Sequence, residues 1–319
     1  MKKDIPRITE TKQIDRYLTK LRSSIDNNTF DELTSYRYSK NSVVAMTKDW
    51  HLFNEFCIYS HYPSLPASVA TIKAFFEREQ QTRKYSTLKR YAVTISLIHY
   101  LFEFKDPIKS REVGLLLEKI RVLGVDSVSE TQALTQEHLK QLRLILGCSQ
   151  SPKDIRDMAI YSVMFECALK RRDLRQLSRT NIQLNEYGDC FVEIEGAVYQ
   201  LSNESSTILL RWLELTPCST VFTGIDRHGN IKDNELNDSS IFRILRQASN
   251  ILDLPFEVKF SSQSCRVGAV KKLAQDGLKI KEIQEFGRWA SPAMPLQYSG
   301  KRTLSEKEKA KFKDDNNYD

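Results

Sequence analysis

The chain has 319 residues, which is enough for two domains that each bury a core of their own. Hydrophobic residues make up 40% of it, and no apolar run approaches the ~18 residues that a membrane helix needs, which argues against a membrane protein. The formal net charge of +7 by itself favours a nucleic acid or another anionic partner only slightly.

The residues that usually hold metals, cofactors and disulfides are scattered. The six cysteines include no CxxC pair, and the five histidines form no cluster with ligand spacing. The chain has no P-loop, Rossmann glycine fingerprint or HExxH motif, so we expect no cofactor and no metal. The polar start MKKDIPRITETKQ is unlike a signal peptide, and scattered cysteines suit a reducing compartment, so we expect a cytoplasmic protein.

The first part of the chain predicts a helical domain. Residues 1–38 are polar and charged, and we expect a short helix and loosely held chain there. Further helices are expected at about 40–60, 69–80, 86–104 (with Ser86 as N-cap) and 110–123. The inward side chains expected for the first of these are Val44, Trp50, Phe53, Phe56 and Cys57. GVDSVSETQA, residues 124–133, is small and polar and predicts an exposed linker between domains.

The second part predicts a mixture of helices and a small hairpin. CFVEIEGAVYQLS, residues 190–202, alternates like two strands that turn around Glu195 and Gly196. Periodicity and capping residues predict the helices. They are expected at 134–146, 151–167 (with Ser151 as cap), 170–177, 204–215 and 238–252, as a pair within 261–289, and at 303–313 before a disordered end.

Two basic runs are candidate phosphate contacts. TRKYSTLKRY places Arg83, Lys84, Lys89 and Arg90 around a helix start, where both the helix N-terminus and the cations would favour phosphate oxygens. The alternative is an ordinary solvated charged face.

The second run, KRRDLRQLSR, adds Arg171, Arg172 and Arg175, which cannot all face a core. They are aimed at DNA or form surface salt bridges with acids such as Asp173.

A third pattern combines an arginine, a tryptophan and a tyrosine in order. In CRVGAVKKLAQDGLKIKEIQEFGRW, Arg266 opens a helix that is followed by Gly287-Arg288-Trp289, and Tyr298 comes nine residues after Trp289. This order resembles the C-terminal motif of the tyrosine recombinase, or phage integrase, family. Upstream, KDIRDMAIYSVMFECALKRRDLRQLSRTNI resembles the box around that family's first arginine, and the N-terminal helices resemble its core-binding domain.

The resemblance spans roughly residues 40–315 and implies a fold. That fold is mainly α with a small antiparallel β element, in two domains. The implied divisions are an N-terminal extension (1–38), a helical, SAM-like core-binding domain (39–123), a linker (124–133), a catalytic-type domain (134–302), and a C-terminal helix and tail (303–319).

The resemblance also implies a chemistry. Family members clamp double-stranded DNA without a metal and attack a phosphodiester with a tyrosine, here Tyr298. Arg266 and Trp289 would contact the phosphate, whose charge protein cations must balance.

The chain departs from the pattern at three places. The first arginine is Lys170, which keeps the charge and loses the guanidinium fork. The hairpin has no lysine to protonate the leaving oxygen, and Gln263 stands where the family has a proton-transferring histidine.

Three functions are therefore open. The first is a recombinase-type DNA-binding protein with weak or absent strand cleavage, acting as a regulator, an accessory subunit or a silent recombination partner. The second is an active site-specific recombinase in which Lys232 or another mobile lysine acts as the acid. The third is a helical scaffold that binds no DNA. The resemblance further implies that the C-terminal helix mediates self-association, or pairing with another recombinase, on DNA.

Overall fold

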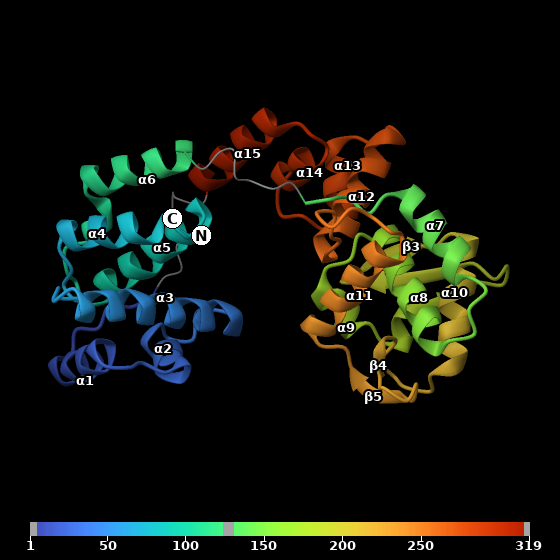
Figure 1. The fold of residues 1–319 in the computed structure, drawn as a ribbon, viewed down its shortest axis with the longest axis horizontal. Coiled ribbons are helices and arrows are strands. Elements are labelled where there is room, and N and C mark those ends of the chain that lie inside the picture. Colours follow the sequence, from blue (N-terminus) through green and yellow to red (C-terminus); the bar gives the residue numbers. More distant parts are fainter. Residues whose placement is uncertain (1–4, 124–130, 316–319) are drawn as a thin grey trace. The chain divides into compact units, whose positions relative to one another are not determined.

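The computed structural model describes residues 5–123 and 131–315 and divides the chain into two compact units, Met1–Ser129 and Glu130–Asp319 (Figure 1). Most of the expected linker, residues 124–130 of 124–133, lies outside the described residues. So do residues 1–4 of the expected N-terminal extension and residues 316–319 of the end that was expected to be disordered.

The N-terminal unit is helical throughout its described part. Its elements are α1 (Thr11–Arg22), α2 (Asn27–Leu33), α3 (Lys40–Tyr59), α4 (Val69–Glu79), α5 (Tyr85–Leu101), a short 3-10 turn (Pro107–Lys109) and α6 (Arg111–Leu123). The four helices expected between residues 40 and 123 are confirmed. The expected cap of α5 is wrong: the N-cap is Lys84 rather than Ser86. The helix begins earlier than Ser86 because the Thr87 and Leu88 amides bond the Lys84 carbonyl.

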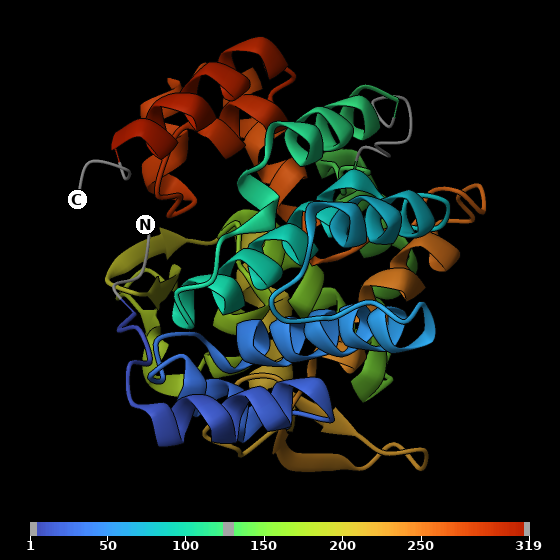
Figure 2. The same cartoon turned by 90° about the vertical axis from the view of Figure 1, so that its left-hand side faces the viewer.

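Residues 5–38 are not loosely held, which corrects the expectation for this segment. Ile25 and Phe30 are fully buried, and the Trp50 indole of α3 donates to the Leu21 carbonyl at 2.9 Å. Figure 2 shows α1 and α2, in dark blue, lying along α3. Tyr17 and Leu21 are buried one turn apart on α1, and Phe30 and Leu33 are buried on α2, so a few apolar residues are enough to anchor this polar segment.

Aromatic side chains form the centre of the N-terminal core. Phe53 of α3 meets Phe75 of α4 edge to face with centroids 5.1 Å apart, and Trp50 lies 5.5 Å from Phe53. The expected inward face of α3 is confirmed except at its start, where Val43 is buried and Val44 only partly so.

The C-terminal unit combines helices with two small antiparallel sheets. Its helices are α7 (Gln136–Leu146), α8 (Pro152–Glu166), α9 (Arg171–Gln176), α10 (Asn203–Leu215), α11 (Asp238–Ile251), α12 (Ser262–Gln275), α13 (Ile280–Phe286), α14 (Ala293–Tyr298) and α15 (Arg302–Asp315). Its strands are β1 (Ile182–Leu184), β2 (Cys190–Ile194), β3 (Ala197–Gln200), β4 (Thr223–Ile225) and β5 (Ile231–Glu235).

The expected hairpin is present as β2 and β3, with β1 added at the edge of β2. Ile194 pairs with Ala197, so Glu195 and Gly196 alone form the turn, both with positive φ (50° and 81°). This is the backbone that a tight two-residue hairpin requires. The β4–β5 hairpin was missed, because β5 is exposed on both faces beyond Ile231 and shows no apolar alternation.

Helix α8 is the centre of the C-terminal core. Every residue from Ile155 to Phe165 is buried, and α7, α10 and α12 pack around it. Gly268 allows α12 to approach the chain before α7, because a Cβ at this position would lie 1.7 Å from the Leu134 carbonyl oxygen. The expected mainly helical fold with a small antiparallel β element is confirmed. Across residues 5–123 and 131–315, no helix is long and apolar enough to span a membrane.

Candidate functional site

Arg266 lies buried in the first turns of α12, where its guanidinium joins two distant backbone segments. It donates to the Ala168 carbonyl, which precedes α9, and at 2.8 Å to the Gly287 carbonyl, which follows α13. Burial lowers the pKa of the guanidinium to about 10, and the positive charge of Arg288 acts in the same direction. That value still leaves Arg266 charged at neutral pH, so the unit keeps a cation in its interior.

Trp289 lies against Arg266. The guanidinium carbon is 4.1 Å from the indole centroid, a cation–π contact. Gly287 makes room for the ring, since a Cβ at this position would be 1.7 Å from an indole carbon. The glycine two residues before Trp289 is therefore a packing requirement of the tryptophan.

Tyr298, at the end of α14, meets Trp289 edge to face with centroids 6.1 Å apart. Its side chain is nearly buried. Burial raises the pKa of the phenol, while the Arg266 charge opposes the rise. The structure thus brings Arg266, Trp289 and Tyr298 together in one cluster.

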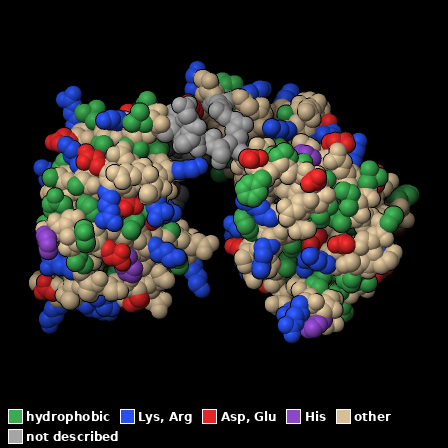
Figure 3. Space-filling model, viewed as in Figure 1, with side chains coloured by type: hydrophobic (Ala, Val, Ile, Leu, Met, Phe, Trp, Pro, Cys, Tyr) green, Lys and Arg blue, Asp and Glu red, His purple; other side chains and the backbone are tan. Residues whose placement is uncertain are grey.

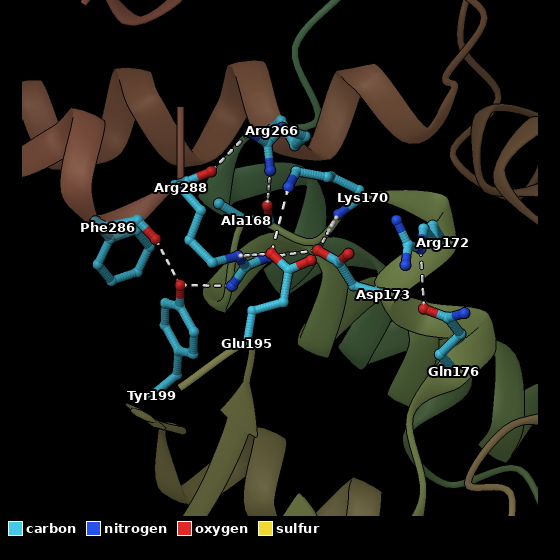
Figure 4. Close-up of polar contacts among 11 residues, drawn as sticks. Ala168, Lys170, Arg172, Asp173, Gln176, Glu195, Tyr199, Arg266, Phe286 and Arg288 are labelled. Atoms are coloured by element: carbon cyan, nitrogen blue, oxygen red, sulfur yellow. Dashed lines mark hydrogen bonds and ion pairs between the residues drawn. The ribbon is translucent and has the colours of Figure 1, made fainter. Parts of the chain in front are cut away.

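Lys170 lies at the start of α9, as its N-cap residue. Its ammonium nitrogen is 3.5 Å from Oε2 of Glu195 at the tip of the β2–β3 turn. Glu195 therefore stands at the hairpin where the family resemblance implied a lysine (Figure 4).

Arg288, which the sequence motif included without a role, is the second buried guanidinium of this region. Its Nη2 donates to Asp173 on α9, and its Nη1 donates to the Tyr199 hydroxyl on β3 at 2.6 Å. The Tyr199 hydroxyl in turn donates to the Phe286 carbonyl at 2.6 Å (Figure 4). No pattern in the sequence shows that Asp173 is buried against Arg288, because the two residues meet only in the folded unit.

Gln263 lies one turn before Arg266 on α12, on the same side of the helix, and is partly buried. Lys232, the other residue considered for proton transfer, is exposed on β5 in the separate two-stranded sheet.

The first basic run surrounds the start of α5, and its four cations are exposed. Arg90 also has a structural partner: its Nε and Nη2 bond both oxygens of buried Asp49 at 2.9 and 2.8 Å. Arg83 lies 3.7 Å from Glu79, the acid at the end of α4. All four cations therefore face solvent, and Arg83 and Arg90 are also tied to buried acids.

The second basic run divides between solvent and salt bridges. Arg171 and Arg172 are exposed on α9, and Arg172 donates to Gln176 one turn later at 3.1 Å. Arg175 is paired with Glu235 at 2.6 Å and lies 3.6 Å from Asp238. On the face shown in Figure 3, Lys and Arg side chains are spread over both units and mixed with acidic ones.

Comparison with known proteins agrees with this architecture. No model of a known protein family matches the chain. The recombinase Cre of Escherichia phage P1 is 19% identical over 283 residues, which cover 80% of this chain and 82% of Cre. Among solved structures, the XerH site-specific recombinase bound to its difH substrate has a TM-score of 0.63 at 13% identity, covering 92% of this chain and 87% of that one. The Tn1549 transposon integrase in complex with circular intermediate DNA has a TM-score of 0.61 at 12% identity, covering 86% and 95%.

These relatives and neighbours are tyrosine recombinases and integrases, the proteins that the motif around Arg266, Trp289 and Tyr298 resembles. The chain has the tyrosine recombinase fold.

Proposed function

We propose that this chain binds double-stranded DNA as a tyrosine recombinase or integrase does, and that its strand cleavage at Tyr298 is weak or absent. The single observation that carries the second part is the acid at the hairpin tip. Glu195, 3.5 Å from the Lys170 ammonium, stands at the hairpin where an active family member would present a lysine to the leaving oxygen. The hairpin thus presents a carboxylate where the family's proton donor is the ammonium of a lysine.

The proposed nucleophile, Tyr298, also lacks a group that could accept its proton. Burial raises the pKa of the Tyr298 phenol, so the hydroxyl needs a base to become a nucleophile at neutral pH. Gln263, one turn before Arg266, can hydrogen-bond a phosphate and cannot take a proton. Each missing acid or base typically costs about 10²–10⁴ in rate. The two losses need not add, but both slow cleavage.

DNA binding depends on a larger and more robust set of contacts. The Tn1549 integrase with this fold was solved in complex with DNA. Phosphate contacts spread over many cations survive changes at a few active-site positions, because each supplies only part of the affinity. In this proposal residues 39–123 act as the core-binding domain and residues 134–302 as the catalytic-type domain. The candidate contacts are Arg83, Lys84, Lys89, Arg90, Arg171, Arg172 and Arg175, all exposed except the half-buried Arg175.

A second function, active recombination with an atypical site, is favoured by one observation. Arg266, Trp289 and Tyr298 are in contact in the folded unit, as a working nucleophile and its phosphate ligands would need to be. If the chain is an active recombinase, another lysine, such as Lys232, donates the proton to the leaving oxygen, and water does the proton transfer that the family assigns to the histidine.

One experiment separates the two functions. Selection from a random duplex library gives the preferred site, and that site is then rebuilt with a nick that traps covalent intermediates. We expect tight, salt-sensitive binding and no covalent product, or one that forms very slowly. A rapid protein–DNA adduct that disappears in Tyr298→Phe would establish the active enzyme instead. Negligible affinity for duplex DNA at low salt would leave only the scaffold that binds no DNA.

The C-terminal helix α15 is the candidate contact between protomers on DNA. In the chain itself it lies on α14, where the buried Ser305 hydroxyl donates to the Ala293 carbonyl at 2.6 Å. The proposal includes self-association, or pairing with another recombinase, on DNA through α15, and native mass spectrometry on a two-site duplex measures it. A single species carrying one protomer would contradict self-association.

A further inference from the structure

One carboxylate lies between two cations at the tip of the β2–β3 hairpin. Oε2 of Glu195 is 3.5 Å from the Lys170 ammonium nitrogen and 3.5 Å from Nε of Arg288 (Figure 4). The three residues come from separate segments: the start of α9, the hairpin turn and the chain after α13. Their convergence marks a position that is built to hold an anion.

The Arg288 side chain is held rigidly beside that position. Its side chain is only 10% exposed, and its two terminal nitrogens are anchored by Asp173 and Tyr199. The remaining edge, Nε–H, is buried and has no hydrogen-bond partner among residues 5–123 and 131–315; the Glu195 carboxylate lies 3.5 Å from it as a loose ion pair. A buried N–H donor left without a hydrogen bond is costly unless a partner completes it.

The backbone shows how Arg288 reaches this place. Its φ is +53°, a conformation that favours glycine. Residues held in such strained conformations persist where the surroundings fix them, and they cluster at functional sites.

We propose that Arg288 binds a DNA phosphate together with Lys170, at the position that the Glu195 carboxylate fills in the free protein. This inference rests on the proposed DNA-binding function. It adds that Arg288 supplies the guanidinium that is lost where Lys170 replaces the family's first arginine. The phosphate takes the hydrogen bond from Nε and one of the N–H groups still available on the terminal nitrogens. Lys170 contributes a point charge, and Arg266 completes the cationic lining.

Glu195 is suited to leave when DNA arrives. Its side chain is 51% exposed, it sits on a two-residue turn, and its two ion pairs are long. Because the carboxylate is half in water and both contacts are long, the two pairs hold Glu195 weakly, and a phosphate that meets three cations can displace it.

Ethylation interference on the duplex recovered by selection tests the contact. Neutralising a phosphate by ethylation weakens binding only if the protein uses the charge of that phosphate. We expect Arg288→Met combined with Asp173→Asn to become insensitive to one phosphate that matters to the unmodified protein, while the rest of the pattern is retained. The affinity should fall about tenfold and the salt dependence by about one counterion.

The paired change guards against misfolding. Arg288→Met alone would leave the Asp173 carboxylate buried and unpaired, whereas asparagine keeps an acceptor for the Lys170 amide, which bonds Asp173 at 3.2 Å. Asp173→Asn alone keeps an oxygen for the Lys170 amide and for Arg288 and removes only the carboxylate charge, so it measures what that loss does by itself; the phosphate contact assigned to Arg288 should persist in its interference pattern even where the affinity falls. Glu195→Gln should bind about two- to fivefold more tightly, also with the complete pattern.

A paired variant that stays folded and still senses every phosphate would show that Arg288 is only a structural brace, and would overturn the inference. Looser binding by Glu195→Gln would equally contradict it. Failure of the unmodified protein to bind duplex DNA would instead remove the proposed function itself, so the two failures are distinguishable.

Discussion

In the N-terminal unit the deeply buried member of an ion pair is the acid. Asp49 is 2% exposed and its partner Arg90 is 52% exposed, while Glu79 is 8% exposed and Arg83 is 51% exposed. In the C-terminal unit the arginine is buried as well: the exposed fractions are 7% for Arg156, 10% for Arg288 and 5% for Arg266.

This difference separates two uses of positive charge. A buried acid such as Asp49 binds one edge of a guanidinium and leaves the rest of that group in water, which fixes a cation on the surface at small cost. A buried guanidinium loses its hydration and must be compensated by several hydrogen bonds. Arg266 and Arg288 meet that requirement beside Trp289 and Tyr199, so the C-terminal unit holds two cations fixed in its interior.

The largest expected effect comes from breaking a buried pair in the C-terminal unit. Arg156→Met leaves the Asp157 carboxylate buried on α8, where burial already raises its pKa. We expect a loss of about 3–5 kcal/mol in the free energy of unfolding. Hydrogen exchange of the α8 amides in the full chain measures it, and the double change Arg156→Met, Asp157→Leu should recover most of the loss.

The matched change in the N-terminal unit is Arg90→Met. Asp49 keeps the Thr94 hydroxyl at 3.4 Å, and the lost partner was half in water, so we expect about 1–2 kcal/mol. Hydrogen exchange of α3 reports it. Equal losses at Arg90 and Arg156 would break the distinction between the two units.

A loss of stability of intermediate size is expected when the pH is lowered, because His99 lies unprotonated in the N-terminal core. Its Nε2 accepts from the Ala67 amide at 2.9 Å and its Nδ1 donates to the Ile95 carbonyl at 2.8 Å, so both nitrogens serve the neutral ring. Burial lowers the pKa of His99 in the folded state. Below the unfolded pKa, about 6.5, the unfolded state binds the extra proton, and stability falls by up to about 1.4 kcal/mol per pH unit.

Denaturant unfolding of the full chain between pH 7.5 and 5 measures this effect, with hydrogen exchange of α5 to localise it. The stability should be fully present above pH 6.5 and decline as the pH falls towards the folded pKa. A His99→Gln variant that keeps the same pH slope would assign the proton uptake to other groups.

The smallest effect on stability is expected on the exposed face of α9. Arg171→Ser with Arg172→Ser should change the free energy of unfolding by less than about 0.5 kcal/mol, because both side chains lie in solvent. The same double change should weaken duplex binding at every sequence and lower the salt slope by about two. Unchanged affinity would show that these two arginines are only a solvated surface.

Local pattern was sufficient for most helices and for part of the site. Val113, Ile120 and their neighbours repeat at helical spacing, and the segment from Arg266 to Trp289 and Tyr298 carries its order in the chain. The sequence did not predict the packing of α1 and α2, whose apolar residues are few, nor the β4–β5 hairpin, whose outer strand is polar on both faces.

The sequence by itself determined most of the helices, the β2–β3 turn and the spacing of Arg266, Trp289 and Tyr298, because each depends on residues that are close along the chain. Only the tertiary structure decided that Arg288 is buried against Asp173, 115 residues away, and Tyr199, 89 residues away, and that Glu195 lies between it and Lys170. The physical reason is that burial of a charge, and the partner that compensates it, depend on segments that meet only when the core forms.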